Sequence, residues 1–222
     1  SILDAASNPL GGTGAFNGNF TGQTYTLDHT APAVQSLNRG TPTASLTNAA
    51  SVTFNVTFSE NVTGVDATDF ALATSGTAAG TIGTVTQVNG TFYTVSVTGV
   101  TGDGTLGLNL VDNDSILDAA SNPLGGTGVF NGNFTGQTYT LDHSAPAVQS
   151  LVRGTPTASL TNASSVTFNV TFSENVTGVD ATDFALATSG TAAGTIGTVT
   201  QVSGTFYTVS VTGVTGDGTL GL

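Results

Sequence analysis

The chain of 222 residues carries 14 Asp and Glu against two Arg, for a formal net charge of −12, and it contains no Cys. This balance argues against nucleic acid and anionic membranes as partners, because both require basic surface. The lack of Cys excludes disulfides and Cys-ligated zinc or iron–sulfur sites. No apolar run approaches the roughly 20 residues that span a bilayer, so no membrane insertion is expected.

The sequence consists of two copies of one repeat. Residues 1–108 recur as residues 115–222, an offset of 114 (115 − 1). A single catalytic site gains nothing from a near-identical copy, whereas a tether, spacer or filament gains length and avidity from each one. The repetition therefore favours a structural or multivalent protein over an enzyme. The copies differ at five pairs of positions: Ala15/Val129, Thr30/Ser144, Asn38/Val152, Ala50/Ser164 and Asn89/Ser203.

The best candidate for a linker is the segment LDHTAP at residues 27–32, with its copy LDHSAP at 141–146. Proline restricts the backbone there, and no apolar alternation runs through either segment. Division at these linkers predicts residues 1–28 as the C-terminal part of an upstream repeat, 29–142 as a complete repeat and 143–222 as the N-terminal part of a downstream repeat. Neither partial repeat is expected to bury its core alone. The missing strands are expected from further sequence on both sides or from a neighbouring chain.

Within the complete repeat, apolar and polar residues alternate with a period of two, as in SVTFNVTF at residues 51–58. Tight turns are expected at Asn89-Gly90 and at Gly102-Asp103-Gly104. Seven short strands without helical periodicity predict an all-β fold of tandem immunoglobulin-like β-sandwich repeats, about seven strands each. A β-solenoid is disfavoured, because its coils recur about every 20–30 residues. In chain order, strands are expected at 33–37, 51–58, 70–74, 81–88, 91–98, 105–111 and 137–141.

A long segment at residues 112–136 lacks this alternation. Connections of this length without structure are uncommon and are usually functional or ordered by other contacts. We expect a short turn at residues 116–120. We also expect Phe130 and Phe134 to hold the segment against the sandwich.

The acidic residues concentrate in two loops that an immunoglobulin-like sandwich places at the end where its N-terminal linker arrives. Carboxylates crowded in this way repel each other by about 4 kcal/mol per pair at about 4 Å and an effective dielectric near 20, unless a cation neutralises them. Oxygen ligands without His or Cys favour Ca²⁺. The alternative is that the acids are solvated or cap local turns. The two loops carry Glu60, Asp66, Asp69, Asp112, Asp114 and Asp118, and the linker adds Asp28.

Asp112-x-Asp114-x-x-x-Asp118 lets three carboxylates converge from one loop, but it lacks the Gly and the terminal Glu of an EF-hand. At a Kd of about 10⁻⁴–10⁻³ M and millimolar Ca²⁺, each site would add roughly 0.4–1.4 kcal/mol, enough to stiffen a hinge but not to fold a domain. Asp103 is expected at the opposite end, facing the next domain. The full set of predicted Ca²⁺ ligands is Asp28, Glu60, Asp66, Asp69, Asp103, Asp112, Asp114, Asp118, Asp142, Glu174, Asp180 and Asp183.

Four stretches resemble the bacterial Ig-like repeats of large secreted surface proteins and RTX-type adhesins. They are D-x-[ST]-A-P at residues 28–32, TFSENV at 57–62, D-x-x-D-F at 66–70 and I-x-D-A-x-x-N-P-L-G-G at 116–126. The resemblance implies a sandwich extender domain in a long array exported to the cell surface, often with Ca²⁺ at domain junctions. The chain departs from the pattern at His29, where such linkers often carry Thr or Asn.

These observations predict a structural extender segment of an extracellular, cell-surface adhesin, whose partners are neighbouring repeats and whose junctions Ca²⁺ stiffens. The alternative is a self-assembling filament or sheath, a homopolymer in which strands of one chain complete the sandwich of another. A glycan- or ice-binding module is a third possibility, with weak support from Thr-x-Thr content. An enzyme is not expected: Glu60 and Asp66 resemble a glycosidase pair, but the chain has no Trp to line a sugar subsite.

Overall fold

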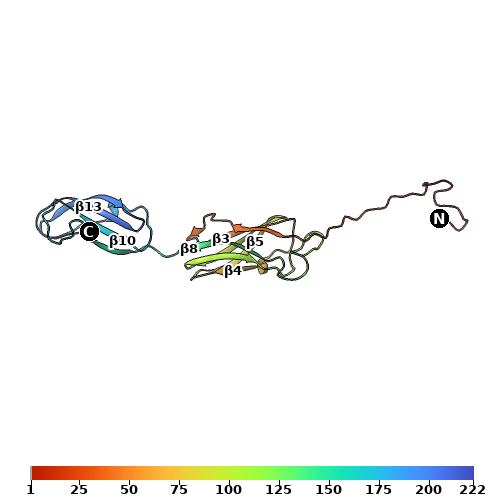
Figure 1. Ribbon diagram of the computed structural model, residues 1–222, viewed down its shortest axis with the longest axis horizontal. Coiled ribbons are helices and arrows are strands. Elements are labelled where there is room, and N and C mark those ends of the chain that lie inside the picture. The colour runs from red at the N-terminus through yellow and green to blue at the C-terminus, as the bar shows by residue number, and fades with distance from the viewer. Residues whose placement is uncertain (1) are drawn as a thin grey trace. The chain divides into compact units, whose positions relative to one another are not determined.

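The computed structural model describes residues 2–222 and divides the chain into two compact units. Unit 1 is Ser1–Asp142 and unit 2 is His143–Leu222 (Figure 1). The boundary falls within the second predicted linker, and residues up to Asp28 belong to unit 1. No helix among the described residues is long and apolar enough to cross a membrane.

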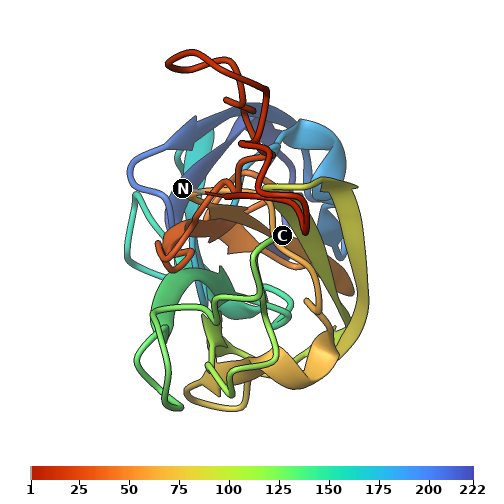
Figure 2. The ribbon, with the colours of Figure 1, turned by 90° about the vertical axis from the view of Figure 1, so that its right-hand side faces the viewer.

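Unit 1 is a β-sandwich of two four-stranded sheets. One sheet has the order β1-β3-β6-β5 and the other β2-β8-β7-β4. Figure 2 views unit 1 from the end at which its linker arrives, so that the strands run away from the reader. All pairs are antiparallel except β2 with β8. The strands are β1 (Val34–Arg39), β2 (Leu46–Thr47), β3 (Ser51–Phe58), β4 (Phe70–Thr74), β5 (Ala79–Asn89), β6 (Phe92–Thr101), β7 (Gly104–Leu110) and β8 (Phe134–Leu141).

The all-β sandwich predicted from the sequence is confirmed. Each of the seven expected strands is present, and the two predicted turns join β5 to β6 and β6 to β7. The short strand β2 was not predicted, because two residues carry too little alternation to be recognised. Its existence depends on β8, with which Leu46 and Thr47 pair.

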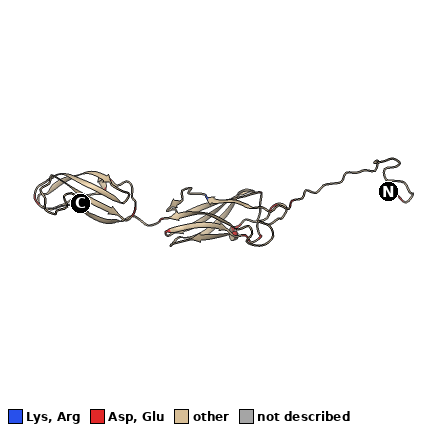
Figure 3. Ribbon diagram, viewed as in Figure 1, with Lys and Arg blue, Asp and Glu red and all other residues tan. Residues whose placement is uncertain are grey.

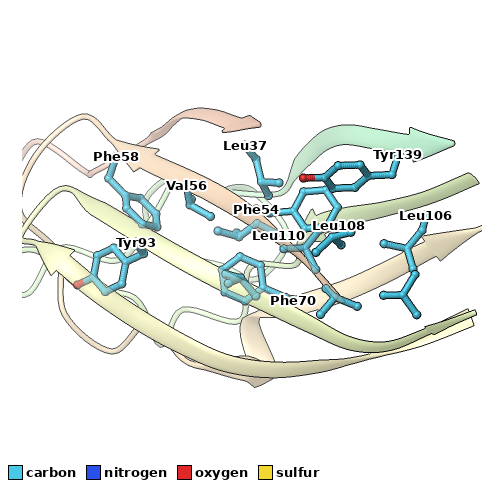
Figure 4. Close-up of a cluster of buried hydrophobic side chains, with 14 of the residues drawn as sticks. Leu37, Phe54, Val56, Phe58, Phe70, Tyr93, Leu106, Leu108, Leu110 and Tyr139 are labelled. Atoms are coloured by element: carbon cyan, nitrogen blue, oxygen red, sulfur yellow. The ribbon is translucent and has the colours of Figure 1, made fainter. Parts of the chain in front are cut away.

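The core of unit 1 comes from the alternating residues of β3, β6 and β7, whose inward side chains are fully buried (Figure 4). Tyr139 of β8 lies among them, and its ring meets Phe54 edge-on with 5.3 Å between centroids. The Tyr139 hydroxyl donates to the carbonyls of Pro42 and Thr53, at 2.8 and 2.9 Å. β8 therefore ties the two sheets together.

The long segment between β7 and β8 packs on the sandwich through residues other than those expected. Phe130 is largely exposed, so its predicted anchoring role is wrong, whereas Phe134 packs against the core. The anchors are Ile116 and Leu124, both fully buried. Phe130 has a positive φ of 71°, which is uncommon for a bulky residue, in a turn at the surface.

Unit 2 repeats the first sheet of unit 1 but holds only a small part of the second. Its sheet β12-β13-β10-β9 is complete, while β11 and β14 form a two-stranded remnant. Its elements are β9 (Val148–Arg153), β10 (Ser165–Phe172), the 3-10 turn η2 (Ala181–Asp183), β11 (Ala187–Thr188), β12 (Ala193–Gln201), β13 (Phe206–Thr215) and β14 (Leu220–Gly221). Its buried apolar residues are Phe168, Val170, Tyr207, Val209 and Val211.

Candidate cation site at the linker end of unit 1

Three carboxylates converge where the first linker meets the sandwich. Asp28 of the linker, Glu60 after β3 and Asp118 of the long loop offer oxygens that all lie within 4.8 Å of one another. We call this group the acidic triad. Figure 3 shows acidic positions at this end of unit 1, the linker end. Among the described residues, it is the one group of three or more acids or histidines so placed.

Asp118 is positioned by its own loop. Its Oδ1 accepts hydrogen bonds from the backbone N–H groups of Ala120 and Asn122, each at 2.8 Å, and its Oδ2 accepts from Asn122 Nδ2 at 2.8 Å. These bonds, led by the one from the Asn122 side chain, lower the pKa of Asp118. The carboxylate is therefore ionised and held rigidly, although its residue is buried.

Asn122 also fastens the linker. Its Nδ2 lies 3.3 Å from the carbonyl oxygens of both Asp28 and Thr30, and Gly125 N–H donates to Pro32 at 2.9 Å. The Asp28 carboxylate accepts from Thr30 N–H at 3.0 Å, which fixes its direction. The repeated N-P-L-G-G motif contains both Asn122 and Gly125, so the signal was present in the sequence, but the role of Asn122 was not predicted.

The surroundings of Glu60 disfavour its ionised form. Its pKa is raised, first by desolvation and then by the negative charges of Asp118 and Asp28. No Lys or Arg contributes to that shift, and the triad offers a cation only hard oxygen ligands. Such a set suits Ca²⁺ or Mg²⁺ rather than a thiophilic or imidazole-binding metal.

The remaining predicted ligands of the two loops lie outside the acidic triad and accept hydrogen bonds within the loops. Asp66 and Asp69 form a capping box on the 3-10 turn η1 (Ala67–Asp69). Asp69 is fully buried, accepts from Ser115 Oγ at 2.7 Å and has a pKa raised mainly by desolvation. The Asp69–Ser115 bond joins the two loops, as does the bridge between Thr63 and Leu117.

Asp112 and Asp114 organise the long loop. Asp112 accepts from Asp114 N–H and Gly132 N–H, each at 3.1 Å, and it is buried. Asp114 Oδ2 accepts from Gly128 N–H at 3.1 Å, whereas its Oδ1 is buried without a hydrogen-bond partner among the described residues. Of the three acids predicted to converge from this loop, Asp118 belongs to the acidic triad, and Asp112 and Asp114 lie outside that group.

The other predicted ligands lie elsewhere. Asp103 sits in the β6–β7 turn at the opposite end of unit 1, near the end of β8, since the adjacent Gly104 pairs with Leu141. In unit 2, Asp180 and Asp183 repeat the capping box of η1 on η2. Asp142 and Glu174 are the counterparts of Asp28 and Glu60 at the offset of 114. The counterpart of Asp118 would be residue 232 (118 + 114), beyond the 222 residues.

No family model and no curated protein sequence matches the chain. Among solved structures it is similar to FdeC, an adhesin of Escherichia coli, with 17% identity and a TM-score of 0.37 over 81% of this chain and 56% of that one. The chain thus spans about half of that structure's length. It is also similar to domains 5–6 of the S-layer protein SbsC, with 16% identity, a TM-score of 0.25 and coverage of 85% and 90%. The sandwich assignment rests on the sheets themselves.

Proposed function

We propose that the chain is an extender segment of a bacterial cell-surface protein, in which Ca²⁺ stiffens the linker where it meets each sandwich. The observation that carries this proposal is the acidic triad. It joins Asp28, a linker residue, to Glu60 and Asp118, two residues of the folded body. An ion held by all three connects the linker to the domain, which is what a stiff joint requires.

Charge supports Ca²⁺ at this position. Three carboxylates whose oxygens lie within 4.8 Å repel each other, and this repulsion adds to desolvation in raising the pKa of Glu60. A divalent cation replaces the repulsion with attraction. Ca²⁺ tolerates irregular oxygen geometry better than Mg²⁺, which demands an octahedron. The Asp28 and Thr30 carbonyls beside Asn122 are further candidate oxygen ligands.

The proposed stiffening adds to hydrogen bonds that already order the linker. Hydrogen bonds from Asn122 and Gly125 hold the linker backbone through Pro32. A Ca²⁺ ion with a Kd of about 10⁻⁴–10⁻³ M would add about 1 kcal/mol at millimolar concentration. That amount is small beside the stability of a domain but comparable to the few hydrogen bonds that fix the linker. Stiffness and length, rather than chemistry, are the proposed function.

Calorimetric titration of the 222-residue chain with Ca²⁺, at concentrations where the chain is monomeric, tests the site. We expect saturable binding at one site, lost in Glu60→Gln, which removes charge but keeps shape. Glu174→Gln is the matched control, since unit 2 contains no counterpart of Asp118. Small-angle scattering with Ca²⁺ and with chelator then tests stiffening. Absence of saturable binding in millimolar Ca²⁺ would refute the calcium role and leave a sandwich repeat.

A further inference from the structure

The hairpin between β5 and β6 presents an Asn-Gly pair at the surface. Asn89 is the last residue of β5 and is exposed, and Gly90 and Thr91 form the turn into β6. The Asn89 side chain folds over this turn, where its Oδ1 accepts from Thr91 N–H at 2.9 Å and from Thr91 Oγ1 at 3.0 Å. This is an Asx turn. The ring that its hydrogen bond closes contains both the Asn89 Cγ and the Gly90 nitrogen.

We propose that Asn89 is a site of spontaneous deamidation, at which the Gly90 nitrogen attacks the Asn89 side-chain amide. A bond forms between that nitrogen and Cγ, and the amide proton passes to water. The bond from Cγ to Nδ2 then breaks and ammonia leaves, which closes a succinimide ring. Water opens the ring at either carbonyl. Opening at Cγ gives aspartate and opening at the main-chain carbonyl gives isoaspartate, and no atom changes its oxidation state.

Three features of the turn favour this attack. The two hydrogen bonds from Thr91 polarise the side-chain carbonyl of Asn89, and the same donors stabilise the negative charge that develops on Oδ1 during attack. Within residues 2–222, the Gly90 N–H donates no hydrogen bond, so no acceptor retains the proton that must leave. Asn89 Nδ2, which becomes ammonia, donates none there either.

A second Asn-Gly pair of unit 1 is held in the opposite way. Asn131 Nδ2 donates to the carbonyls of Gly126 and Thr127 at 3.1 and 3.2 Å, which retains the leaving group. The Gly132 N–H donates to Asp112 Oδ2 at 3.1 Å, and the negative charge of that carboxylate opposes loss of the amide proton. Asn131 is therefore expected to be protected, although the same residue follows it in the sequence.

The turn at Gly90 is bonded to the segment that supplies Glu60. The Gly90 carbonyl accepts from Val62 N–H and the Thr91 carbonyl accepts from Phe58 N–H, each at 2.9 Å. Isoaspartate directs the main chain through Cγ and adds one backbone atom before Gly90, which shifts both carbonyls away from these donors. Isoaspartate at position 89 therefore loosens residues 58–62, at the linker end of unit 1.

Unit 2 shows that the hairpin does not require Asn at this position. Ser203 is the counterpart of Asn89, and the neighbouring contact is kept, since Val176 N–H donates to the Gly204 carbonyl at 3.0 Å. Serine has no amide to lose, so the hairpin of unit 2 does not undergo the reaction. Asn89→Ser is therefore a control variant that already occurs in the second copy of the same hairpin.

Peptide mass spectrometry of the folded 222-residue chain tests the proposal, after incubation at mildly alkaline pH, where amide protons are lost more readily. We expect conversion of Asn89 to the acid, with isoaspartate among the products, well before conversion of Asn131. Cleavage before Asp separates the peptide of Asn131 from its copy near the N-terminus, because the two differ at Ala15/Val129. In urea, where both turns are lost, the rates at Asn89 and Asn131 should converge.

Thr91→Val should slow the reaction of the folded chain by about fivefold, because it removes one of the two donors to Asn89 Oδ1 and leaves the backbone donor in place. Ageing should also speed hydrogen exchange at the Val62 amide in the unmodified chain but not in Asn89→Ser.

The proposal is overturned if folded Asn89 reacts no faster than folded Asn131, or if their difference persists in urea. An unaltered rate in Thr91→Val would likewise contradict the activation by the Asx turn. None of these measurements involves calcium, so the deamidation site and the calcium role fail separately.

Discussion

Residues 2–28 and 116–142 have the same sequence apart from Ala15/Val129, yet only part of their structure is shared. The turn held by Asp4 and Asn8 is the turn held by Asp118 and Asn122, with the same hydrogen bonds. The strand is not shared, since residues 134–141 form β8 and residues 20–27 form none. Turns close over four residues, so they form wherever the sequence occurs, whereas a strand requires partners from elsewhere in the chain.

The two units differ in the same way: strands that are neighbours in sequence pair in both units, whereas pairings that need β8 occur only in unit 1. The sheet β12-β13-β10-β9 matches β1-β3-β6-β5 because its strands are neighbours in sequence. The second sheet collapses to β11 and β14 where no counterpart of β8 is present. Phe184 and Asp183 are consequently more exposed than Phe70 and Asp69, which β7 and the long loop cover in unit 1. Matched substitutions in the two copies can therefore separate local from tertiary effects.

The largest expected difference is between Gly136→Val and Gly22→Val. In β8 the new side chain meets backbone at Leu108, so unit 1 should lose about 3 kcal/mol or more of unfolding free energy. The same change at Gly22 should leave unfolding of unit 1 unaltered. Urea denaturation followed by tyrosine fluorescence measures both. Equal losses at the two positions would show that residues 20–27 are packed in the monomer.

Tyr139→Phe and Tyr25→Phe form the next pair. Loss of the Tyr139 hydroxyl leaves the part-buried carbonyl of Pro42 without this donor, whereas the Thr53 carbonyl still accepts from Gly40 N–H at 2.8 Å. We expect a cost of about 1–2 kcal/mol. Tyr25→Phe should cost nothing in the monomer, because Tyr25 is exposed. Thermal unfolding at low protein concentration provides the measurement, and a stable Tyr139→Phe protein would contradict the role given to the hydroxyl.

Asn122→Ala tests the fastening of the linker. The substitution removes bonds to Asp118, Asp28 and Thr30, and we expect a loss of about 1 kcal/mol, concentrated at the linker. Hydrogen exchange should become faster at residues 30–33 and stay unchanged in β3. Asn8→Ala is the control in the monomer. Unchanged exchange in the linker would mean that Asn122 does not hold it.

The smallest expected effect is the pH dependence of the stability that Glu60 contributes. Its pKa is raised in the folded state, so its contribution to stability is full below the unfolded pKa and is lost as the pH rises through the folded pKa. Without Ca²⁺, Glu60→Gln should therefore slightly raise the Tm at neutral pH and have no such effect below about pH 4. With Ca²⁺, Glu60→Gln should instead lower the Tm at neutral pH. A Glu60→Gln protein whose Tm stays above that of the unmodified chain in Ca²⁺ would argue against an ion at the acidic triad.

The end of the sandwich at which the acidic triad lies could be predicted from the order of the strands. The loops that carry Glu60 and Asp118 meet at one end, with Asp28 beside them, as the alternation of strands and the linker position predicted. Which acids share a site did not follow. Asp66 and Asp69 lie in the same loop as Glu60, but their oxygens are oriented into the capping box of η1. A count of acidic residues carries no information on that orientation.

The sequence by itself determined the repeat, the alternation that makes sheets, and the turns at Asp4 and Asp118, because all of these depend on residues close together in the chain. Only the tertiary structure decided that Tyr139 is buried while Tyr25 is exposed. The reason is physical: a strand gains its hydrogen bonds and apolar contacts from partners distant in sequence. Identical residues therefore fold differently according to whether those partners are within reach.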